Sequence, residues 1–198
     1  MQKNTLLIKE LENVAPHNER HLLALFALLG IPKTYIDIGC GIGTMVKTAA
    51  RLGVHAKGID VIEVAVEPTD PPYYFEQHDL NTMYRCNEEF DLVTCLEVAE
   101  HLDNGKPLCK SLSYLVKLGG ILVFTAATPG QGGIDHISLL PPSNWRGWLV
   151  DNGLTYSRQL TIMLAMVWSN IHSPLGHLAS NLQVFTKGSV RTPSGIEV

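Results

Sequence analysis

A glycine-rich segment, Asp37 to Gly43, has the residue types and the spacing of a ligand-binding turn. It reads Asp-Ile-Gly-Cys-Gly-Ile-Gly and lies between an expected strand and an expected helix. Glycine allows a tight backbone turn and lets a ligand approach without a Cβ in the way, and the N–H groups that begin the helix face that ligand. A dinucleotide site has its third glycine three residues after the second, but Thr44 stands there and the glycine comes one residue early. The spacing therefore disfavours a ligand bound through a pyrophosphate.

Two acids follow later strands of the chain. Asp60 ends the second expected strand, where a carboxylate can accept hydrogen bonds from both hydroxyls of a ribose, and Val61 beside it could pack on an adenine face. Asp79 follows the third expected strand and could accept from the adenine amino group, although aspartate is also common in turns that bind nothing. These positions predict a nucleoside ligand without saying which one, because dehydrogenases use the same position as Asp60.

A cluster of acids and histidines could bind a metal or move protons. Glu97 and Glu100 are one helical turn apart, His101 is adjacent, and His136 lies in the loop after the next strand. Two carboxylates and two imidazoles could hold a divalent cation. Histidine also exchanges protons near neutral pH, so we expect His101 and His136 as catalytic bases and no bound metal, with capping or packing as the structural alternative. Histidines without a motif, among them His177, are expected to be surface or packing residues.

Alternating strands and helices must position these residues. Strands are expected at 35–38, 54–60, 73–77, 90–96 and 121–126, and helices at 6–11, 18–29, 44–51, 106–116 and 141–152. The pair Gly119-Gly120 is expected to end the helix that begins at 106. The alternation predicts an α/β fold with a doubly wound parallel sheet in a single domain. Ligands of such sheets lie at the carboxyl ends of the strands, where the residues above are found.

The C-terminal part of the chain is less regular. Residues 154–166 are apolar with no clear strand or helix period, and 181–186 is expected to be a last strand. The polar tail at 188–198 is expected to fray. The chain is therefore divided into N-terminal helices at 1–33 that could act as a lid, a ligand-binding domain at 34–187, and the tail.

Composition limits the kinds of partner. The chain has 198 residues, 45% of them hydrophobic, which suffices for one packed domain without disulfides or a structural metal. A net charge of -4 gives no sign of the basic surface that binds duplex nucleic acid. The four cysteines form no Cys-x-x-Cys pair, the N-terminus lacks a signal-peptide pattern, and the apolar stretch 22–29 is too short to span a bilayer. We expect a cytoplasmic protein without a membrane partner, and the oligomeric state is left open.

The segment from Tyr35 to Thr128 resembles the class I S-adenosylmethionine (SAM)-dependent methyltransferases. The Asp-x-Gly-x-Gly-x-Gly turn resembles their first motif, Asp60 their second and Asp79 their adenine-side acid. Residues 90–102 resemble their fourth-strand motif, and 115–123 resemble the segment that follows it. The resemblance implies a Rossmann-like methyltransferase fold of seven strands, the last one antiparallel, with SAM as the cofactor.

The same resemblance implies roles for individual residues. Asp37 would accept from the ammonium group of SAM, directly or through water, and Leu96 and Glu97 would line the pocket near its methionine part. The helix at 18–29 would lie near the cofactor mouth. The residues expected to contact the cofactor are Asp37, Gly39, Cys40, Gly41, Gly43, Asp60, Val61, Asp79, Leu80, Leu96 and Glu97.

The acid and histidine cluster resembles two kinds of methyltransferase. Together, Glu97, Glu100, His101 and His136 resemble the metal ligands of small-RNA 3′-terminal 2′-O-methyltransferases. The wording Glu-Val-x-Glu-His, however, is common in metal-free small-molecule methyltransferases, including the ubiquinone-pathway type. Base N-methyltransferases usually carry Asn/Asp-Pro-Pro-aromatic after the fourth strand, where this chain has Leu-Glu-Val-Ala.

We therefore predict SAM-dependent methyl transfer to an O or N atom of a small-molecule acceptor. One alternative is an RNA or protein methyltransferase with the same cofactor site, including metal-assisted 2′-O-methylation. The others are a nucleotide-binding oxidoreductase, which the early third glycine opposes, and a non-catalytic module that retains the fold.

Overall fold

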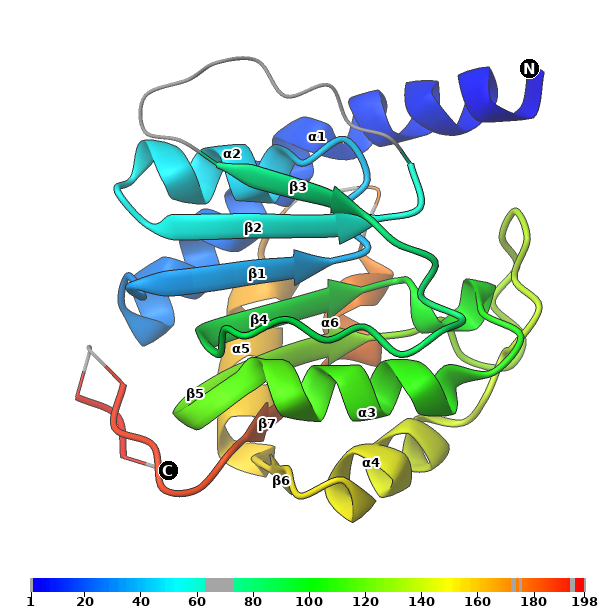
Figure 1. The fold of residues 1–198 in the computed structure, drawn as a ribbon. Helices are drawn as coiled ribbons and strands as arrows, with labels where there is room; N and C mark the ends of the chain where they lie inside the picture. The colour runs from blue at the N-terminus through cyan, green and yellow to red at the C-terminus, as the bar shows by residue number, and fades with distance from the viewer. Residues whose placement is uncertain (1, 63–72, 172–173, 175, 193–194, 198) are drawn as a thin grey trace.

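The computed structural model describes residues 2–62, 73–171, 174, 176–192 and 195–197. They contain a seven-stranded sheet in the order β3-β2-β1-β4-β5-β7-β6 (Figure 1). The strands are β1 Thr34–Ile38, β2 His55–Asp60, β3 Tyr74–Gln77, β4 Phe90–Leu96, β5 Val116–Thr125, β6 Thr155–Tyr156 and β7 Gln183–Thr186. Strands β1 to β5 are parallel, and β7 is antiparallel to both β5 and β6. The predicted doubly wound, mostly parallel seven-stranded sheet with an antiparallel closing strand is confirmed.

Helices cover both faces of this sheet (Figure 1). They are α1 Gln2–Leu29, α2 Thr44–Arg51, α3 Gly105–Leu115, α4 Pro142–Asp151, α5 Arg158–Ser169 and α6 His177–Asn181, with a short 3₁₀ turn, η1, at Ala99–His101. Alternate residues of β5 enter two cores: Val123 packs with α1, α2 and α5, whereas Phe124 packs with α3 and α4. Because helices lie on both faces, β4 is apolar at most positions. None of the helices in the described part of the chain combines the length and apolar character needed to span a bilayer.

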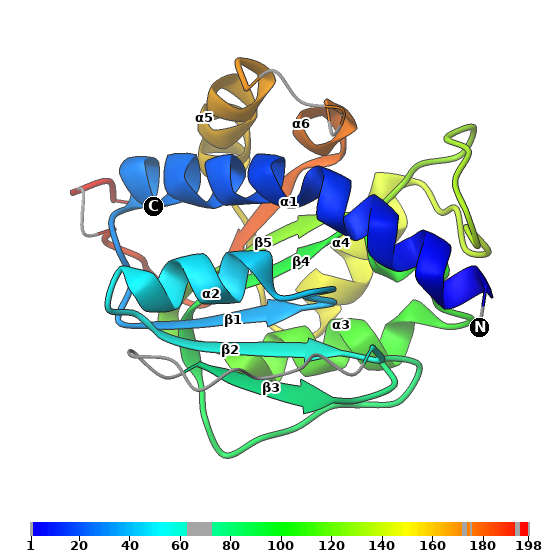
Figure 2. The ribbon, with the colours of Figure 1, turned by 90° about the horizontal axis from the view of Figure 1, so that it is seen from above.

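The N-terminal region is one helix, where two were predicted. Helix α1 continues through Pro16 to Leu29 and lies between α2 and α5 (Figure 2). An internal proline costs a helix about 3 kcal/mol, so the packing of α1 against α2 and α5 must compensate. Leu22 and Phe26 are buried in the core, and Trp168 of α5 donates its indole N–H to the carbonyl of His21 over 3.2 Å. These contacts join elements that are far apart in the sequence, so the local sequence pattern could not predict the continuous helix.

The predicted stop at Gly119-Gly120 is wrong. Helix α3 ends at Leu115, and both glycines lie inside β5, where the pairing with β4 shifts register. A Cβ on Gly120 would lie 2.8 Å from the carbonyl oxygen of Lys117 and 2.9 Å from that of Phe90. Gly120 is therefore needed because the backbone of neighbouring residues comes close to it where the pairing of β5 with β4 is irregular, and it does not end a helix.

Other element boundaries differ from the prediction by a few residues. The ambiguous segment 154–166 forms the short β6 and most of α5. In the described part of the tail, Val190 and Thr192 are buried and Thr192 donates its N–H to the carbonyl of Ile196, while the fraying expected there stays a prediction. The domain division itself stays a prediction.

Gly105 in α3 and Gly147 in α4 give a matched test of how these two helices pack together. A Cβ on Gly105 would lie 2.1 Å from Cζ3 of Trp145, whose ring is buried, whereas a Cβ on exposed Gly147 would meet nothing within 4 Å. Gly105→Ala is expected to lower the free energy of unfolding by about 1–3 kcal/mol through overpacking. Gly147→Ala, in the middle of α4, is expected to raise it by about 0.5–1 kcal/mol. Urea unfolding measures both, and equal effects would contradict this packing.

Candidate active site

The glycine turn connects β1 to α2 in a conformation that other residues resist. Gly39, Gly41 and Gly43 all have positive φ, at 79°, 55° and 77°. The N–H groups of Gly39 and Cys40 both donate to the carbonyl of Ile59, at 2.7 and 3.1 Å, which ties the turn to β2. The sequence pattern is therefore explained by backbone geometry, and the turn lies directly after β1, at the carboxyl end of the sheet.

Asp37 is a buried carboxylate at the start of this turn. It is 5% exposed and accepts a 2.6 Å hydrogen bond from the hydroxyl of Thr94, which lies 2.7 Å from the hydroxyl of Tyr35. Burial raises the pKa of Asp37 to about 7, the hydrogen bond from Thr94 opposes that rise, and the charge of Asp60 adds to it. No salt bridge in the described part of the chain involves Asp37. A cationic ligand group would compensate this buried charge.

A cavity of about 190 Å³ adjoins Asp37. Its wall consists of Leu11, Val14, Asn18, Asp37, Gly39, Cys40, Gly41, Thr44, Met45, Leu96, Glu97 and Leu178. Six of the residues predicted to contact a cofactor are thereby brought together, with α1 and α6 on the outer side. Of the segment 18–29, only Asn18 lines this cavity, and the first half of α1 supplies the other contacts.

The other predicted cofactor residues lie outside that wall. Asp60 is next to it, and its carboxylate accepts from the N–H of Gly41 over 2.7 Å and from the N–H of Ile62 over 2.9 Å. Val61 is 61% exposed. The other three have contacts within the protein that explain their residue types. Gly43 lies against the ring of Phe75, and the carboxylate of Asp79 accepts hydrogen bonds from the backbone and the side chain of Asn81. Leu80 is buried in the core. Their roles in binding stay predictions.

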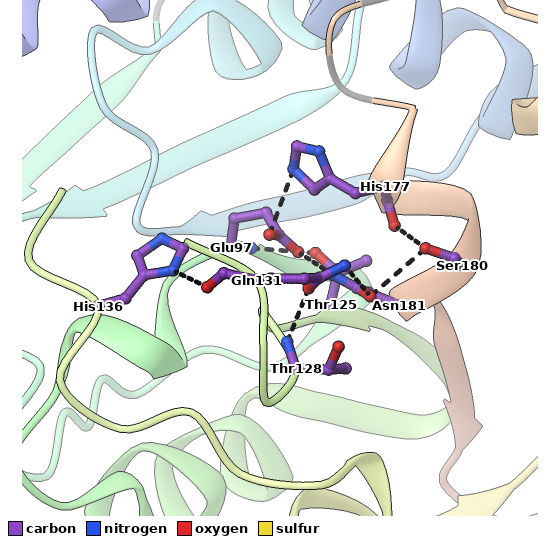
Figure 3. A network of polar contacts seen from close by, with 8 residues as sticks. All are labelled: Glu97, Thr125, Thr128, Gln131, His136, His177, Ser180 and Asn181. Carbon is purple, nitrogen blue, oxygen red and sulfur yellow. Dashed lines mark hydrogen bonds and ion pairs between the residues drawn. The ribbon is translucent and has the colours of Figure 1, made fainter. Parts of the chain in front are cut away.

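Glu97 follows β4 in an unusual backbone conformation. It has a φ of 54°, which is rare for a non-glycine residue, and its N–H donates to the carbonyl and the hydroxyl of Thr125. Its carboxylate lies 3.3 Å from Nε2 of His177 and 3.4 Å from Nδ2 of Asn181, both in α6 (Figure 3). Burial raises the pKa of Glu97, but the hydrogen bonds from His177 and Thr125 outweigh it and leave the pKa below its ordinary value. The hydrogen bond to Glu97 in turn raises the pKa of His177.

His177 and Asn181 were not found from the sequence. His177 was expected to be a surface or packing residue, and nothing in the pattern around either residue marks it. The structure instead joins α6 to the end of β4, more than seventy residues earlier in the chain. Such a contact depends on the tertiary fold, and one sequence carries no local signal for it.

Glu100, His101 and His136 form a second group beside Glu97. Glu100 is fully buried, and neither of its carboxylate oxygens has a hydrogen-bond partner among the described residues. Burial and the charge of Glu97 raise the pKa of Glu100 to about 8. The two imidazoles meet edge to face with their centres 4.9 Å apart, and burial followed by the neighbouring His136 lowers the pKa of His101.

Backbone carbonyls determine which ring nitrogen of each histidine is available. Nδ1 of His101 lies 3.2 Å from the carbonyl oxygen of Asp135, and Nδ1 of His136 lies 3.4 Å from that of Gln131. A carbonyl only accepts, so Nδ1 carries the proton in each ring. In the neutral ring Nε2 then keeps a lone pair, which can accept a proton or bind a metal.

The same group has the donors of a metal site. Glu100, His101 and His136 each offer a ligand atom, and these atoms lie within 4.8 Å of one another. One carboxylate and two imidazoles suit a divalent transition metal. Glu97, the fourth member of the set considered from the sequence, directs its carboxylate to His177 and Asn181.

The sequence as a whole matches a known family. A family described as "Methyltransferase domain" matches residues 11–159. The chain is 28% identical over 175 residues to a ubiquinone biosynthesis O-methyltransferase of Coxiella burnetii, covering 74% of this chain and 73% of that protein. It is 28% identical over 152 residues to the protein of the same name from Colwellia psychrerythraea, covering 60% and 59% of the two chains.

Solved structures share the fold. A Haloferax volcanii methyltransferase structure, in complex with the activator Trm112, superposes with a TM-score of 0.62 and 17% identity, covering 91% of this chain and 93% of that one. Human N-acetylserotonin methyltransferase in complex with SAM gives a TM-score of 0.60 and 17% identity, covering 91% of this chain and 55% of that one. The family match extends over most of the chain and includes both the glycine turn and the acid and histidine cluster. The chain therefore belongs to this methyltransferase family, within the class I superfamily, and is an enzyme that uses SAM as its methyl donor.

Proposed function

We propose that the enzyme methylates an oxygen atom of a small-molecule acceptor, with His101 and His136 as the proton-accepting residues. The observation that carries this proposal is the pair of imidazoles near Glu97, a residue of the cofactor cavity wall. In each ring Nδ1 is bonded to a carbonyl, and Nε2 has no hydrogen-bond partner among the described residues. A hydroxyl must lose its proton as it attacks, and a neutral imidazole accepts it at physiological pH. The relatives named as O-methyltransferases also support oxygen as the methylated atom.

The residues of the cavity fit SAM. In this proposal the buried Asp37 carboxylate pairs with the ammonium group, and the glycine turn gives its edge to the nucleoside. Asp60, held by the N–H groups of Gly41 and Ile62, accepts from the ribose hydroxyls. When bound, SAM supplies an electrophilic methyl group. Leu96 and Glu97 line the same cavity on the side of the histidine pair.

The outer wall must move to admit the cofactor. The cavity measures about 190 Å³, whereas pockets for ligands of this size range from about 300 to 1,000 Å³. Leu11 and Val14 of α1 and Leu178 of α6 are the apolar side chains on that wall. A displacement of α1 or α6 would open it, in keeping with the proposed lid at 1–33.

The surroundings of His136 favour a neutral acceptor with an apolar body. Ile134 and Ile137 flank it and are 46% and 60% exposed. The loop from 128 to 140 contains no lysine or arginine. A nucleic acid would need positive charge there to hold its phosphates. The acceptor proposed is therefore a hydroxyl compound, such as a phenol, rather than RNA.

Calorimetry followed by a methyl-transfer assay tests this function. We expect S-adenosylhomocysteine to bind at micromolar concentration and NAD not to bind. With SAM, a panel of matched phenols and anilines should be methylated at the phenol hydroxyls, with the rate falling as pH drops and protonates the imidazoles. Transfer only to amines, or binding of NAD alone, would overturn the proposal.

A divalent cation could also act at the same site, because the carboxylate of Glu100, which has no hydrogen-bond partner among the described residues, lies near the two imidazoles. If turnover depends on it, dialysis against EDTA should lower the rate of methyl transfer, and Mg²⁺, Mn²⁺ or Zn²⁺ should restore it. The affinity for S-adenosylhomocysteine should not change, because the three residues do not line the cofactor cavity. Turnover that is unaffected by chelation leaves acid–base chemistry by the histidines alone.

A further inference from the structure

Two amide side chains from distant parts of the chain form a reciprocal pair beside the site. Asn181, at the end of α6, donates from Nδ2 to Oε1 of Gln131 over 2.9 Å, and Nε2 of Gln131 donates to Oδ1 of Asn181 over 3.3 Å. Asn181 is only 3% exposed. Figure 3 shows the pair between Glu97 on one side and the loop that carries His136 on the other. A buried amide pair of this kind fixes the relative position of the two segments.

The hydrogen bonds of these two amides can form in only one orientation of each side chain. Asn181 Nδ2 has a second hydrogen, which it directs to Oε1 of Glu97 at 3.4 Å. Gln131 Oε1 has a second lone pair, which accepts from the N–H of Thr128 over 2.7 Å. Reversing Asn181 would bring its oxygen against the carboxylate, and reversing Gln131 would bring its NH₂ group against an N–H. The arrangement therefore has a defined polarity, from Glu97 through both amides to Thr128.

The backbone of Gln131 continues the connection to His136. Its N–H donates to the carbonyl of Thr128 over 3.0 Å, so side chain and main chain together close the turn at 128–131. The carbonyl of the same residue accepts from Nδ1 of His136. The position of that carbonyl, and with it the protonated nitrogen of His136, depends on the turn that the amide pair holds.

We propose that Gln131 and Asn181 are positioning residues that hold His136 with Nδ1 protonated and Nε2 free beside Glu100 and His101. This inference rests on the proposed function, because it assigns the free Nε2 a use in the reaction. It also connects the two halves of the site, since α6 contributes Leu178 to the cofactor cavity and Asn181 to the loop of His136. Neither Gln131 nor Asn181 lines the cofactor cavity.

The test compares Gln131→Met with wild type in the full-length protein. Methionine keeps the length of the side chain and removes all three hydrogen bonds of the Gln131 amide, on a loop where loss of the fold is not expected. Long-range ¹H–¹⁵N spectra of histidine-labelled protein at pH 8 report which ring nitrogen is protonated, and His136→Gln identifies the signal. Ser169→Ala is the control, because Ser169 is exposed and its hydroxyl donates to the carbonyl of Met166 within α5, away from the amide pair.

We expect the Nδ1–H form of His136 in wild type and in Ser169→Ala, and a shift toward the Nε2–H form in Gln131→Met. With a methylated phenol as readout, kcat should fall about 10- to 100-fold, as for other misplaced catalytic groups, with unchanged affinity for S-adenosylhomocysteine. An unchanged tautomer in Gln131→Met, or an Nε2–H form in wild type, would overturn the inference. Asn181→Asp, which puts a carboxylate against Glu97, should shift the tautomer in the same direction if it folds. If no acceptor is methylated by wild type, the proposed function fails, while the tautomer still decides the positioning role.

Discussion

Asp37→Asn is expected to lose nearly all affinity for SAM while the protein becomes no less stable. Asparagine keeps the size of the side chain and can still accept from Thr94, but it removes the charge that would pair with the ammonium group. Breaking a buried pair of this kind costs several kcal/mol, roughly 3–5 at most sites, so the dissociation constant should rise at least 100-fold. The free protein, by contrast, is relieved of a buried carboxylate that no basic side chain in its described part pairs with. Calorimetry gives the affinity and urea unfolding the stability.

Asp91→Asn is the matched contrast, because Asp91 lies at the start of β4, whereas Asp37 lies near the end of the neighbouring strand β1. Asp91 accepts from the N–H groups of Lys33 and Thr34 and pairs with Lys117 over 2.9 Å. Burial raises the pKa of Asp91, but the hydrogen bonds from Lys117 and Thr34 outweigh it and leave the pKa below its ordinary value. We expect this variant to lose stability and to bind SAM normally. If Asp91→Asn weakened binding as much as Asp37→Asn, loss of charge near the sheet would explain the effect and a direct contact would not.

The raised pKa of Asp37 gives the first prediction a pH dependence with a defined sign. Its pKa of about 7 in the folded protein lies above the ordinary value of 3.8, so the folded state holds a proton that the unfolded state lacks between these values. The contribution of Asp37 to the stability of the free protein should therefore fall as pH rises from about 4 to 7, and level off above. SAM pairs with the ionised form, so its affinity should rise through the upper part of that range. Glu100, whose pKa is also raised, still contributes to the pH dependence of stability in Asp37→Asn, so the difference between wild type and variant measures the Asp37 part of each dependence.

Much of the sheet could be predicted from the sequence because its signals are local. Strands β1 and β4 are short, mostly apolar runs, and β1 to β4 each end at or just before a glycine or an acid that marks the carboxyl edge of the sheet. The glycine turn was predictable for the same reason, since three positive φ angles require glycine at a fixed spacing. The two glycines in β5 show the limit of this reasoning. Their role follows from the carbonyls of Phe90 and Lys117, and only the folded chain reveals that contact.

The polar network of the site could not be predicted, for a related physical reason. Glu97, Gln131 and Asn181 are joined by hydrogen bonds between residues 50 and 84 positions apart. A hydrogen bond requires the donor–acceptor distance to lie within a few tenths of an ångström of about 2.9 Å. No pattern of residue types defines positions that closely. The sequence therefore indicated Glu97 and His136 through their motif and loop, and missed the amides and His177 that contact them.

Gly133→Ala is expected to disable His136 without changing that residue. A Cβ on Gly133 would lie 2.2 Å from both Cε1 and Nε2 of His136, so the imidazole must move away. The backbone itself should accept alanine, because Gly133 is not among the residues with positive φ. If Nε2 of His136 takes the acceptor proton, a displacement of about 1 Å should lower kcat about 100-fold. Steady-state kinetics with the methylated acceptor measures this, together with the affinity for S-adenosylhomocysteine, which should not change.

Gly132→Ala is the control, since a Cβ there would meet no atom within 4 Å and its φ is also not positive. The two variants make the same chemical change in adjacent residues of one exposed loop, so a general effect on loop flexibility would appear in both. Only contact with the imidazole distinguishes them. A large loss of kcat confined to Gly133→Ala therefore assigns the reaction to the position of His136, and normal turnover in both variants would remove His136 from the mechanism and leave His101 as the base.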